Sequence, residues 1–318
     1  AIGMSFFNFE IGSRMGEAMK MIVTGGTGFV GRALCEVFSR KGHRIVVLTR
    51  RPVEARRLLV SPVTVVEWNA REGGAWERSL EGADAVINLA GAPIAENRWT
   101  ESRKQLLTYS RVVPTRLLVE AMSRRASKPR VLVSASGIGF YGASDDRVLD
   151  ERAVNGQGFL AGLSMAWEAE ALRAGQSGIR VVLMRTGMVL EQDGGALPRM
   201  LAPFRFFAGG PIMPGTQWIS WIHRDDLIEL YDWAIRTAEI VGPVNAVAPE
   251  AVRMKQFCEV LGKVLHRPSW LPVPSLALKV MFGELGTMLT TGQRVAPSKA
   301  LAGGFAFHHP PLEGAKRT

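Results

Sequence analysis

A glycine-rich turn is the clearest chemical signal in the sequence. Gly25, Gly28 and Gly31 recur at three-residue spacing within the stretch TGGTGFVG. A predicted strand (Met21–Thr24) precedes them and a predicted helix (Phe29–Phe38) follows. Glycine allows a tight turn, close approach of a pyrophosphate and close packing of helix on strand, and the free N–H groups of the helix then face the anion. The turn predicts a dinucleotide site made by Gly25, Thr27, Gly28, Phe29, Val30 and Gly31.

The next predicted strand, Arg44–Thr49, bears on which dinucleotide binds. A Rossmann unit recognises the adenosine ribose at the end of this strand, where an Asp or Glu would bind the 2′-hydroxyl of NAD. Here Thr49 is followed by Arg50 and Arg51, with no acidic residue. A guanidinium group can stack on adenine and bind a 2′-phosphate. Thr49 and Arg50 therefore predict NADP(H) rather than NAD(H); the alternative is that both arginines are solvated loop charges.

A near-continuous apolar run, Ala83–Leu89, predicts a buried parallel strand. Small residues follow it, beginning with Ala90 and Gly91. Small residues at the carboxyl end of such a strand fit the crevice that a dinucleotide crosses. Leu89, Ala90 and Gly91 are therefore predicted to contact the cofactor, the alternative being an ordinary strand-ending turn.

Composition limits the class of protein and its compartment. The chain has 318 residues and is 47% hydrophobic, which is enough for a large core. Its two cysteines, Cys35 and Cys258, form no disulfide framework and predict a cytoplasmic location, or an organelle stroma or matrix in a eukaryote. No apolar run is long enough to span a bilayer, so no membrane association is expected. Residues 1–18 show no clear period and are predicted to be a leader or a cloning remnant.

The formal net charge of +10 raises the question of an anionic partner. The basic residues are mostly scattered, and the densest group, Arg124 to Arg130, falls at a predicted helix C-terminus, where cations are favoured. An anionic cofactor or small-molecule substrate accounts for part of the excess, so nucleic acid is not the expected partner. No His, Cys, Asp or Glu cluster has metal-ligand spacing, and no metal site is predicted.

The order of the elements predicts an α/β fold. Strands and helices alternate through residue 187, which is typical of a Rossmann-type doubly wound parallel sheet. We assign residues 19–187 to an NADP(H)-binding Rossmann domain and residues 188–318 to a smaller C-terminal α/β lobe for a substrate or a partner. The lobe contains predicted strands at Trp218–Ile222 and Pro243–Ala248. Other predicted strands are Thr64–Trp68, Arg130–Ser136 and Ile179–Arg185, and other predicted helices are Thr100–Met122 (kinked or broken at Pro114), Phe159–Ala174, Ala196–Phe207, Leu227–Thr237, Met254–Leu265 and Leu276–Leu289.

These motifs, in this order, resemble the extended short-chain dehydrogenase/reductase superfamily of sugar-nucleotide epimerases and dehydratases. The motifs are TGGTGFVG, Leu89-Ala90-Gly91, the segment 134–142 and Ile222-His223-Arg224-Asp225-Asp226. The pairs Arg98-Trp99 and Trp167-Glu168 and the C-terminal segment are similar to the branch labelled "epimerase family protein", of the YfcH-like type. The resemblance covers about residues 19–314 and implies an NADP(H)-binding protein whose activity is mostly unassigned.

The superfamily's Tyr-x-x-x-Lys acid/base pair is missing. The matching helix, Phe159–Ala174, contains neither tyrosine nor lysine, and the matched positions fall among Leu160, Gly162, Ser164 and Ala166. Ser136 lies near the superfamily's substrate-binding serine. Glu168 could replace the acid/base or be structural, and His223 could be a base or could seat the helix that follows.

Arg111 falls where the superfamily's long helix usually carries an asparagine near the nicotinamide. It could contact a cofactor phosphate or ribose, or an anionic substrate; a solvated helix charge is the alternative.

Two functions are consistent with this pattern. The first is an oxidoreductase or epimerase that uses NADP(H) on an unidentified substrate, with nucleotide sugars as one candidate class. The second is a catalytically degenerate NADP(H)-binding sensor or assembly partner, a role that a cell-division label on some members of the branch suggests.

Overall fold

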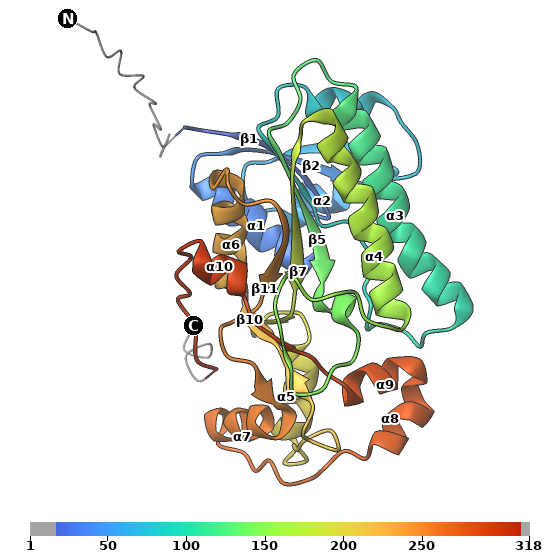
Figure 1. Cartoon of the computed structure of the whole chain (residues 1–318), viewed down its shortest axis with the longest axis vertical. Coiled ribbons are helices and arrows are strands. Elements are labelled where there is room, and N and C mark those ends of the chain that lie inside the picture. The colour runs from blue at the N-terminus through green and yellow to red at the C-terminus, as the bar shows by residue number, and fades with distance from the viewer. Residues whose placement is uncertain (1–16, 313–318) are drawn as a thin grey trace, which may run out of the picture.

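The computed structural model describes residues 17–312, and the predicted leader at residues 1–18 lies almost wholly outside them. A seven-stranded sheet forms the centre of the molecule, with the strand order β11-β7-β5-β4-β1-β2-β3 (Figure 1). All of its neighbouring strands are parallel. The strands are β1 (Lys20–Thr24), β2 (Arg44–Thr49), β3 (Thr64–Glu67), β4 (Ala85–Asn88), β5 (Val131–Gly137), β7 (Arg180–Thr186) and β11 (Gly242–Ala246).

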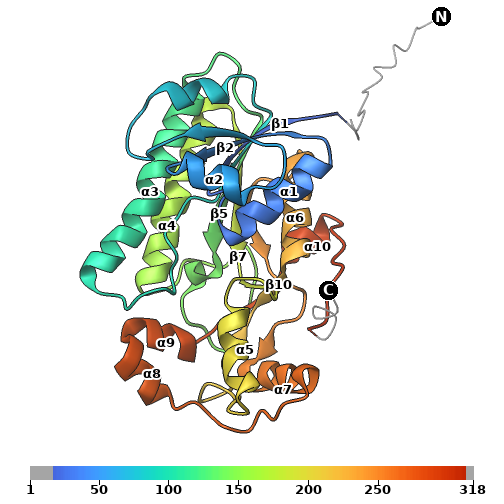
Figure 2. The same cartoon turned by 180° about the vertical axis from the view of Figure 1, so that it is seen from behind.

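Helices cover both faces of this sheet, which confirms the predicted fold class. On one face α1 (Phe29–Arg40) and α6 (Arg224–Arg236) bury Leu34, Phe38 and Tyr231 against the strands. On the other face α3 (Glu101–Ser123) and α4 (Phe159–Leu172) bury residues such as Leu118 and Ala171. Figure 2 shows α3 and α4 on one side of the sheet and α1 and α6 on the other, with the short α2 (Pro52–Leu58) near β2.

A smaller α/β lobe with its own core lies beyond the carboxyl end of the sheet (Figure 1). Trp221, Phe204 and Phe257 are buried at its centre. Its strands are β8 (Met188–Leu190), β9 (Trp218–Ile219), β10 (Trp221–His223) and β12 (Val252–Arg253), and its helices are α5 (Leu197–Arg205), α7 (Met254–Leu265), α8 (Ser275–Phe282) and α9 (Glu284–Thr290). Two short strands, β6 (Val148–Leu149) and β13 (Arg294–Val295), pair separately, and α10 (Ser298–Ala302) returns to the sheet.

One predicted strand belongs to a different part of the molecule. The sequence analysis placed Pro243–Ala248 in the lobe, but β11 pairs in parallel with β7 as an edge strand of the main sheet. A helix, α6, precedes β11 and packs on α1, so the alternation of strand and helix continues past residue 187. The division into two domains at that residue stays a prediction.

Three local predictions were wrong. The single strand predicted at Trp218–Ile222 is two strands with different partners, β12 for β9 and β8 for β10. The helix predicted at Leu276–Leu289 is interrupted at Gly283, whose φ is +62°. A break of the helix at Pro114 is likewise wrong, because packing of α3 on α4 and the sheet outweighs the one backbone hydrogen bond that proline removes; a kink at Pro114 stays a prediction.

None of the helices within residues 17–312 combines the length and the apolar character needed to cross a membrane.

An arginine at the start of β7 ties α6 to the sheet, and its removal is a test of the fold. The Arg180 guanidinium donates to the carbonyls of Ala234, Ile235 and Ile240 at 2.7–2.8 Å. We expect Arg180→Met to lower the free energy of unfolding in urea by about 2–3 kcal/mol, because two carbonyls at the end of α6 and that of Ile240, in the segment that follows the helix, lose a charged donor. Arg130→Met, at an exposed ion pair with Asp84, is the control and should change it by less than about 0.5 kcal/mol. Equal losses in the two variants would contradict this role for Arg180.

Candidate functional site

The glycine turn is shaped by very close backbone contacts. Gly25 has a φ of +68°, and its carbonyl accepts the N–H of Gly28 at 3.0 Å. A Cβ on Gly31 would lie 2.3 Å from the Gly25 oxygen, and a Cβ on Gly25 would lie 2.6 Å from the oxygen of Leu89. No side chain larger than hydrogen fits at these two positions without moving the backbone. Helix α1 therefore starts directly against the turn, at the carboxyl ends of β1 and β4.

The N-terminus of α1 is open to an anion. Gly28 is its N-cap residue and is exposed, no side chain caps the helix, and its first turn has no acidic residue. The unsatisfied N–H groups and the positive end of the helix dipole therefore lack a negative partner from this turn. Thr27 is half-buried beside Gly28, while Val30 packs its side chain on the core and keeps only its backbone toward this end. The residues fit a pyrophosphate at this place.

Phe29, in the first turn of α1, contacts the lobe. A Cβ on Gly194 would lie 2.4 Å from the Phe29 ring, and one on Gly195 would lie 3.1 Å from it. The segment before α5 thus passes directly over the start of α1. The sequence analysis assigned Phe29 to the cofactor and did not anticipate this glycine contact.

A buried polar group joins the ends of the central strands. Thr24 Oγ1 donates to Asn88 Oδ1 at 2.7 Å and accepts the N–H groups of Leu89 and Ala90 at 3.2 Å. Asn88 Nδ2 in turn donates to Thr115 and Ser134, the latter its register partner on β5. These bonds fix the backbone from Leu89 toward Gly91. A fixed backbone is what contact with a cofactor would require here, and that contact itself stays a prediction.

At the end of β2 the two arginines differ. The Thr49 hydroxyl accepts the N–H of Arg51 at 3.2 Å, and the Arg51 side chain pairs with Glu54 at 3.1 Å. Arg50 is exposed and forms no ion pair within residues 17–312. Arg50 thus remains available for a phosphate, as predicted, whereas Arg51 already has a local partner.

Two of the three predicted catalytic residues meet in a buried ion-pair network. Ser136 Oγ donates to Glu168 Oε1 at 2.6 Å. Arg185, the register partner of Ser136 on β7, donates to both Glu168 oxygens at 2.8 Å. The Glu168 and Arg185 side chains are only 6% and 5% exposed. Burial disfavours the charge of Arg185, but the bonds and the charge of Glu168 outweigh this and raise the pKa of Arg185.

The network continues from Arg185 toward the edge of the sheet. Arg185 donates to the Tyr141 hydroxyl at 3.0 Å, and that hydroxyl donates to Asn245 Oδ1 at 2.7 Å. The guanidinium also lies 3.4 Å from the Phe140 ring centroid. Burial raises the pKa of Tyr141 and so favours the neutral phenol, although Arg185 opposes the shift. Neither Arg185 nor Asn245 was predicted from the sequence to belong to the site. The one signal for Arg185 was its place at the end of the apolar run of β7, where a charged side chain needs a partner.

Arg111 is not a solvated helix charge. It is only 6% exposed, and it donates to the carbonyls of Ala92 at 2.9 Å and Leu107 at 3.2 Å. Its guanidinium carbon lies 5.2 Å from the Trp167 ring centroid. Burial, and next the charge of Arg103, lowers the pKa of Arg111 to about 10. That alternative is therefore wrong, while contact with a cofactor or an anionic substrate stays a prediction.

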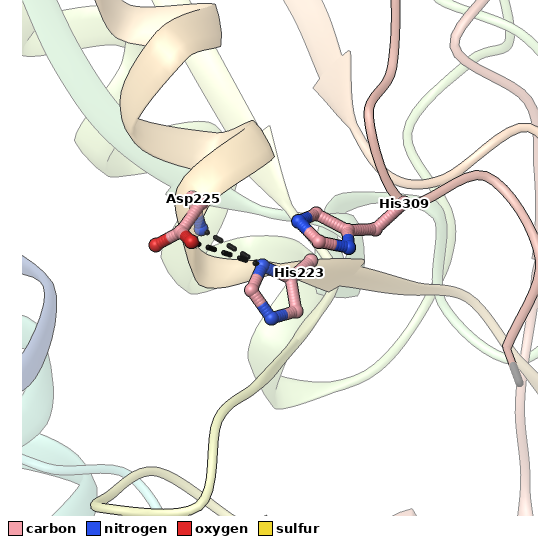
Figure 3. Close-up of side chains that lie close together, drawn as sticks. All are labelled: His223, Asp225 and His309. Carbon is pink, nitrogen blue, oxygen red and sulfur yellow. Dashed lines mark hydrogen bonds and ion pairs between the residues drawn. The ribbon is translucent and has the colours of Figure 1, made fainter. Parts of the chain in front are cut away.

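His223 lies on a different element from this network. It is the N-cap residue of α6, and its Nδ1 accepts the N–H of Asp225 at 3.2 Å, which confirms that it seats this helix. Its ring stacks on His309 at a centroid distance of 3.9 Å (Figure 3). Burial, and next the neighbouring His309, lowers the pKa of His223. A role as a catalytic base stays a prediction.

The same three residues form a cluster of metal-ligand type that the sequence analysis did not foresee. The ligand atoms of His223, Asp225 and His309 lie within 4.8 Å of one another. Stacked imidazole rings direct their in-plane lone pairs alongside one another rather than to a common point, and His223 Nδ1 already accepts a hydrogen bond (Figure 3). The arrangement therefore does not favour a shared ion as it stands. His309 reaches this place because the buried Asp226 carboxylate accepts the N–H groups of His308 and His309 at 2.8 and 3.0 Å.

Comparison with known proteins assigns the family. The profile described as "NAD dependent epimerase/dehydratase family" matches residues 21–246, and that of a domain of unknown function, DUF1731, matches residues 273–317. The chain belongs to the NAD dependent epimerase/dehydratase family. This confirms the predicted superfamily, together with the branch that carries its own C-terminal segment.

Relatives within this family include named proteins of several organisms. The chain is 41% identical to "Epimerase family protein SDR39U1 homolog, chloroplastic" of Arabidopsis thaliana, over 96% of this chain and 88% of that protein. A crystal structure of human epimerase family protein SDR39U1 with NADPH is similar at a TM-score of 0.84, with 34% identity over 93% of this chain and 97% of that one. A nucleoside-diphosphate sugar epimerase from Corynebacterium glutamicum is similar at a TM-score of 0.76, with 31% identity over 94% of this chain and 57% of that one.

The buried ion pair predicts a distinctive pattern of stability. Arg185→Met leaves the buried Glu168 carboxylate without its cation, and we expect a loss of about 3–5 kcal/mol in urea unfolding. The double variant Glu168→Leu/Arg185→Met removes both charges and should recover most of that loss. Arg116→Met is the control. It breaks an exposed ion pair between Arg116 on α3 and Glu170 on α4, the helix that also carries Glu168, and should have a much smaller effect. A double variant less stable than Arg185→Met would contradict the argument.

Proposed function

We propose that the chain is an NADP(H)-dependent oxidoreductase or epimerase that acts at a hydroxyl or carbonyl carbon of a small substrate. The family and the turn at Gly25–Gly31 support a nicotinamide dinucleotide, as does the relative whose crystal structure contains NADPH. Arg50, exposed and without an ion pair among the described residues, supports the phosphorylated form. When bound, the cofactor supplies or accepts a hydride.

Each part of the cofactor has a place at the carboxyl edge of the sheet. The N-terminus of α1 would hold the pyrophosphate, and Arg50 would pair with the adenosine 2′-phosphate. The nicotinamide half then passes the end of β4 at Leu89–Gly91 and comes toward Ser136 on β5. The N-terminus of α1, Arg50 and Leu89–Gly91 bind and orient the cofactor, and none of them moves a proton.

The observation that carries the proposal is the 2.6 Å hydrogen bond from Ser136 to Glu168. With its proton directed at Glu168, the Ser136 oxygen can accept a hydrogen bond from a substrate hydroxyl. During oxidation, that hydroxyl proton would pass to Ser136 as the serine proton passes to Glu168. Arg185 donates to both Glu168 oxygens and so holds this acceptor in place beside Ser136. The proposed relay replaces the absent Tyr-x-x-x-Lys pair on α4.

The substrate class follows from the family alone. One relative is described as a nucleoside-diphosphate sugar epimerase, so nucleotide sugars are the first class to test. The smaller lobe, which lies beyond the carboxyl end of the sheet, would supply the other wall of the substrate site. We propose the cytoplasm as the compartment, or an organelle stroma or matrix in a eukaryote; one plant relative is named as chloroplastic.

A second candidate function is a catalytically degenerate NADP(H)-binding sensor or assembly partner. The observation that favours it is the saturation of Glu168, whose two oxygens accept from Arg185 and Ser136. A carboxylate held in this way can be purely structural. A protein partner, linked to cell division or otherwise, belongs to this second proposal.

Turnover separates the two functions. We expect NADPH oxidation with at least one member of a panel of nucleotide sugars and simple carbonyl compounds. Ser136→Ala should then lower kcat by about a hundredfold, because the relay loses its first group, and should leave NADPH affinity unchanged. Ser134→Ala, two residues earlier on the same strand, should leave kcat within about threefold. Tight NADPH binding without turnover by any panel member would favour the sensor, and an unchanged kcat in Ser136→Ala would exclude the relay.

Cofactor preference tests the role of Arg50. Arg50→Asp should weaken NADPH binding by about 10- to 100-fold and leave NADH binding within about threefold, because only NADPH carries the 2′-phosphate. Arg51→Asp is the matched control, since Arg51 is already paired with Glu54, and should weaken NADPH binding far less. Calorimetric titration of both nucleotides measures this. Equal losses of NADPH and NADH affinity in Arg50→Asp would show that Arg50 does not bind the phosphate.

A further inference from the structure

Side-chain donors hold the backbone carbonyls of the loop after β4. Its four successive carbonyls, from Ala92 to Ala95, each accept a hydrogen bond from a side-chain N–H group, three of them from helices and one from Trp99 of the same loop. The donors are Arg111 to Ala92, Arg103 to Pro93, Trp99 Nε1 to Ile94 at 3.0 Å and Arg199 Nη1 to Ala95 at 3.0 Å. Three of the four donors are guanidinium groups, two from α3 and one from α5. We call Arg103, Arg111 and Arg199 the arginine cluster.

The arginine cluster has no anionic partner within residues 17–312. None of its three members forms an ion pair there, whereas Lys104, on the same helix, pairs with Glu284. Backbone carbonyls accept hydrogen bonds but carry no net charge, so the positive charges remain uncompensated. Arg111 is only 6% exposed, and Arg103 Nε is buried with no hydrogen-bond partner among the described residues. Arg103 is half-buried and Arg199 is exposed, whereas Arg111 is buried; buried charges in proteins are normally paired, so Arg111 is the member that most lacks a counter-charge.

The position of the arginine cluster indicates which kind of ligand would supply the missing negative charge. A Cβ on Gly91 would lie 3.0 Å from the Arg111 guanidinium carbon, so this group rests against the backbone at the end of β4. Arg50 and the open N-terminus of α1 lie at the ends of β2 and β1, on the other side of β4 from β5. The cofactor phosphates therefore have their own partners. From Arg111 the cluster runs along α3 toward its N-terminus and across to α5 of the lobe, away from those partners (Figure 1).

We propose that the arginine cluster binds an oxyanion of the substrate, a phosphate or a carboxylate group, beside the nicotinamide. The proposal rests on the proposed function, since it requires a substrate at this edge of the sheet. Guanidinium groups form paired hydrogen bonds with both kinds of oxyanion, and the carbonyls of residues 92–95 hold them in place before the ligand arrives. The cluster thus selects acidic substrates over neutral carbonyl compounds.

Anion binding by the NADP⁺-saturated protein tests this inference. Saturation fills the α1 site, so added inorganic phosphate or succinate reports on other sites. We expect saturable binding of at least one of these two probes, by calorimetry against a chloride blank of equal ionic strength. Binding of phosphate alone or of succinate alone identifies which oxyanion the site prefers, and either result supports the proposal. If neither probe binds more tightly than chloride, the proposal is overturned.

Variants tie that binding to the cluster. Arg103→Gln and Arg111→Gln should each weaken the probe at least tenfold, and Arg111→Lys should weaken it less than Arg111→Gln. Arg124→Gln, an exposed arginine of the same chain paired with Glu77, is the control and should have no effect. Arg103→Gln keeps the test decisive if Arg111→Gln does not fold. Unchanged probe binding in Arg103→Gln would overturn the proposal.

NADP⁺ affinity, measured by dialysis on the same samples, separates this inference from the proposed function. It should be unchanged in both Gln variants. A parallel loss of NADP⁺ affinity would assign the cluster to the cofactor and overturn the proposal. Wild-type protein that binds NADP⁺ but neither probe would overturn this inference alone, whereas folded protein that binds no NADP⁺ would overturn the proposed function.

Discussion

The contact between the Gly25 carbonyl and the Cα of Gly31 is the constraint on which the rest of the site depends. At this point helix α1 and the turn from β1 approach so closely that only hydrogen fits between them. The contact aims the uncapped N-terminus of α1 at the carboxyl edge of the sheet. Thr24 and Asn88 then fix the end of β4 beside it. A short run of small residues thus places an uncapped helix N-terminus beside the end of β4.

The residues at the far end of that path differ from those usual in the superfamily. Helix α4 carries no tyrosine and no lysine, and the conspicuous group on its inner face is Glu168. Both oxygens of this carboxylate accept hydrogen bonds, from Arg185 and Ser136. Tyr141 and Asn245 extend the network to the edge strand β11. An ion pair of this kind contributes more to a fixed geometry than to net stability, since burying two charges offsets much of their attraction. The fold of the family is retained, while the residues on the inner face of α4 differ.

Local patterns predicted most of the fold, because the features concerned lie close together in sequence. The spacing of Gly25, Gly28 and Gly31 between β1 and α1 is one example, and the apolar run of β4 is another. Features set by distant contacts were missed. Arg185 meets Glu168 only because β7 lies beside β5, and Asn245 meets Tyr141 from 104 residues away. The place of β11 in the sheet and the contact of His309 with His223 likewise depend on tertiary packing, which periodicity does not report.

The central claim is that a nicotinamide dinucleotide lies across the carboxyl edge of this sheet, with its pyrophosphate on α1. Equilibrium dialysis of the full chain against NADPH, with folding confirmed by circular dichroism, tests it most directly. The account predicts saturable binding of one NADPH per chain, and loss of that binding in a folded Gly28→Asp variant, whose carboxylate would occupy the N-terminus of α1. Wild-type protein that is folded and binds no NADPH, or a Gly28→Asp variant that binds it as well as wild type, would contradict the account.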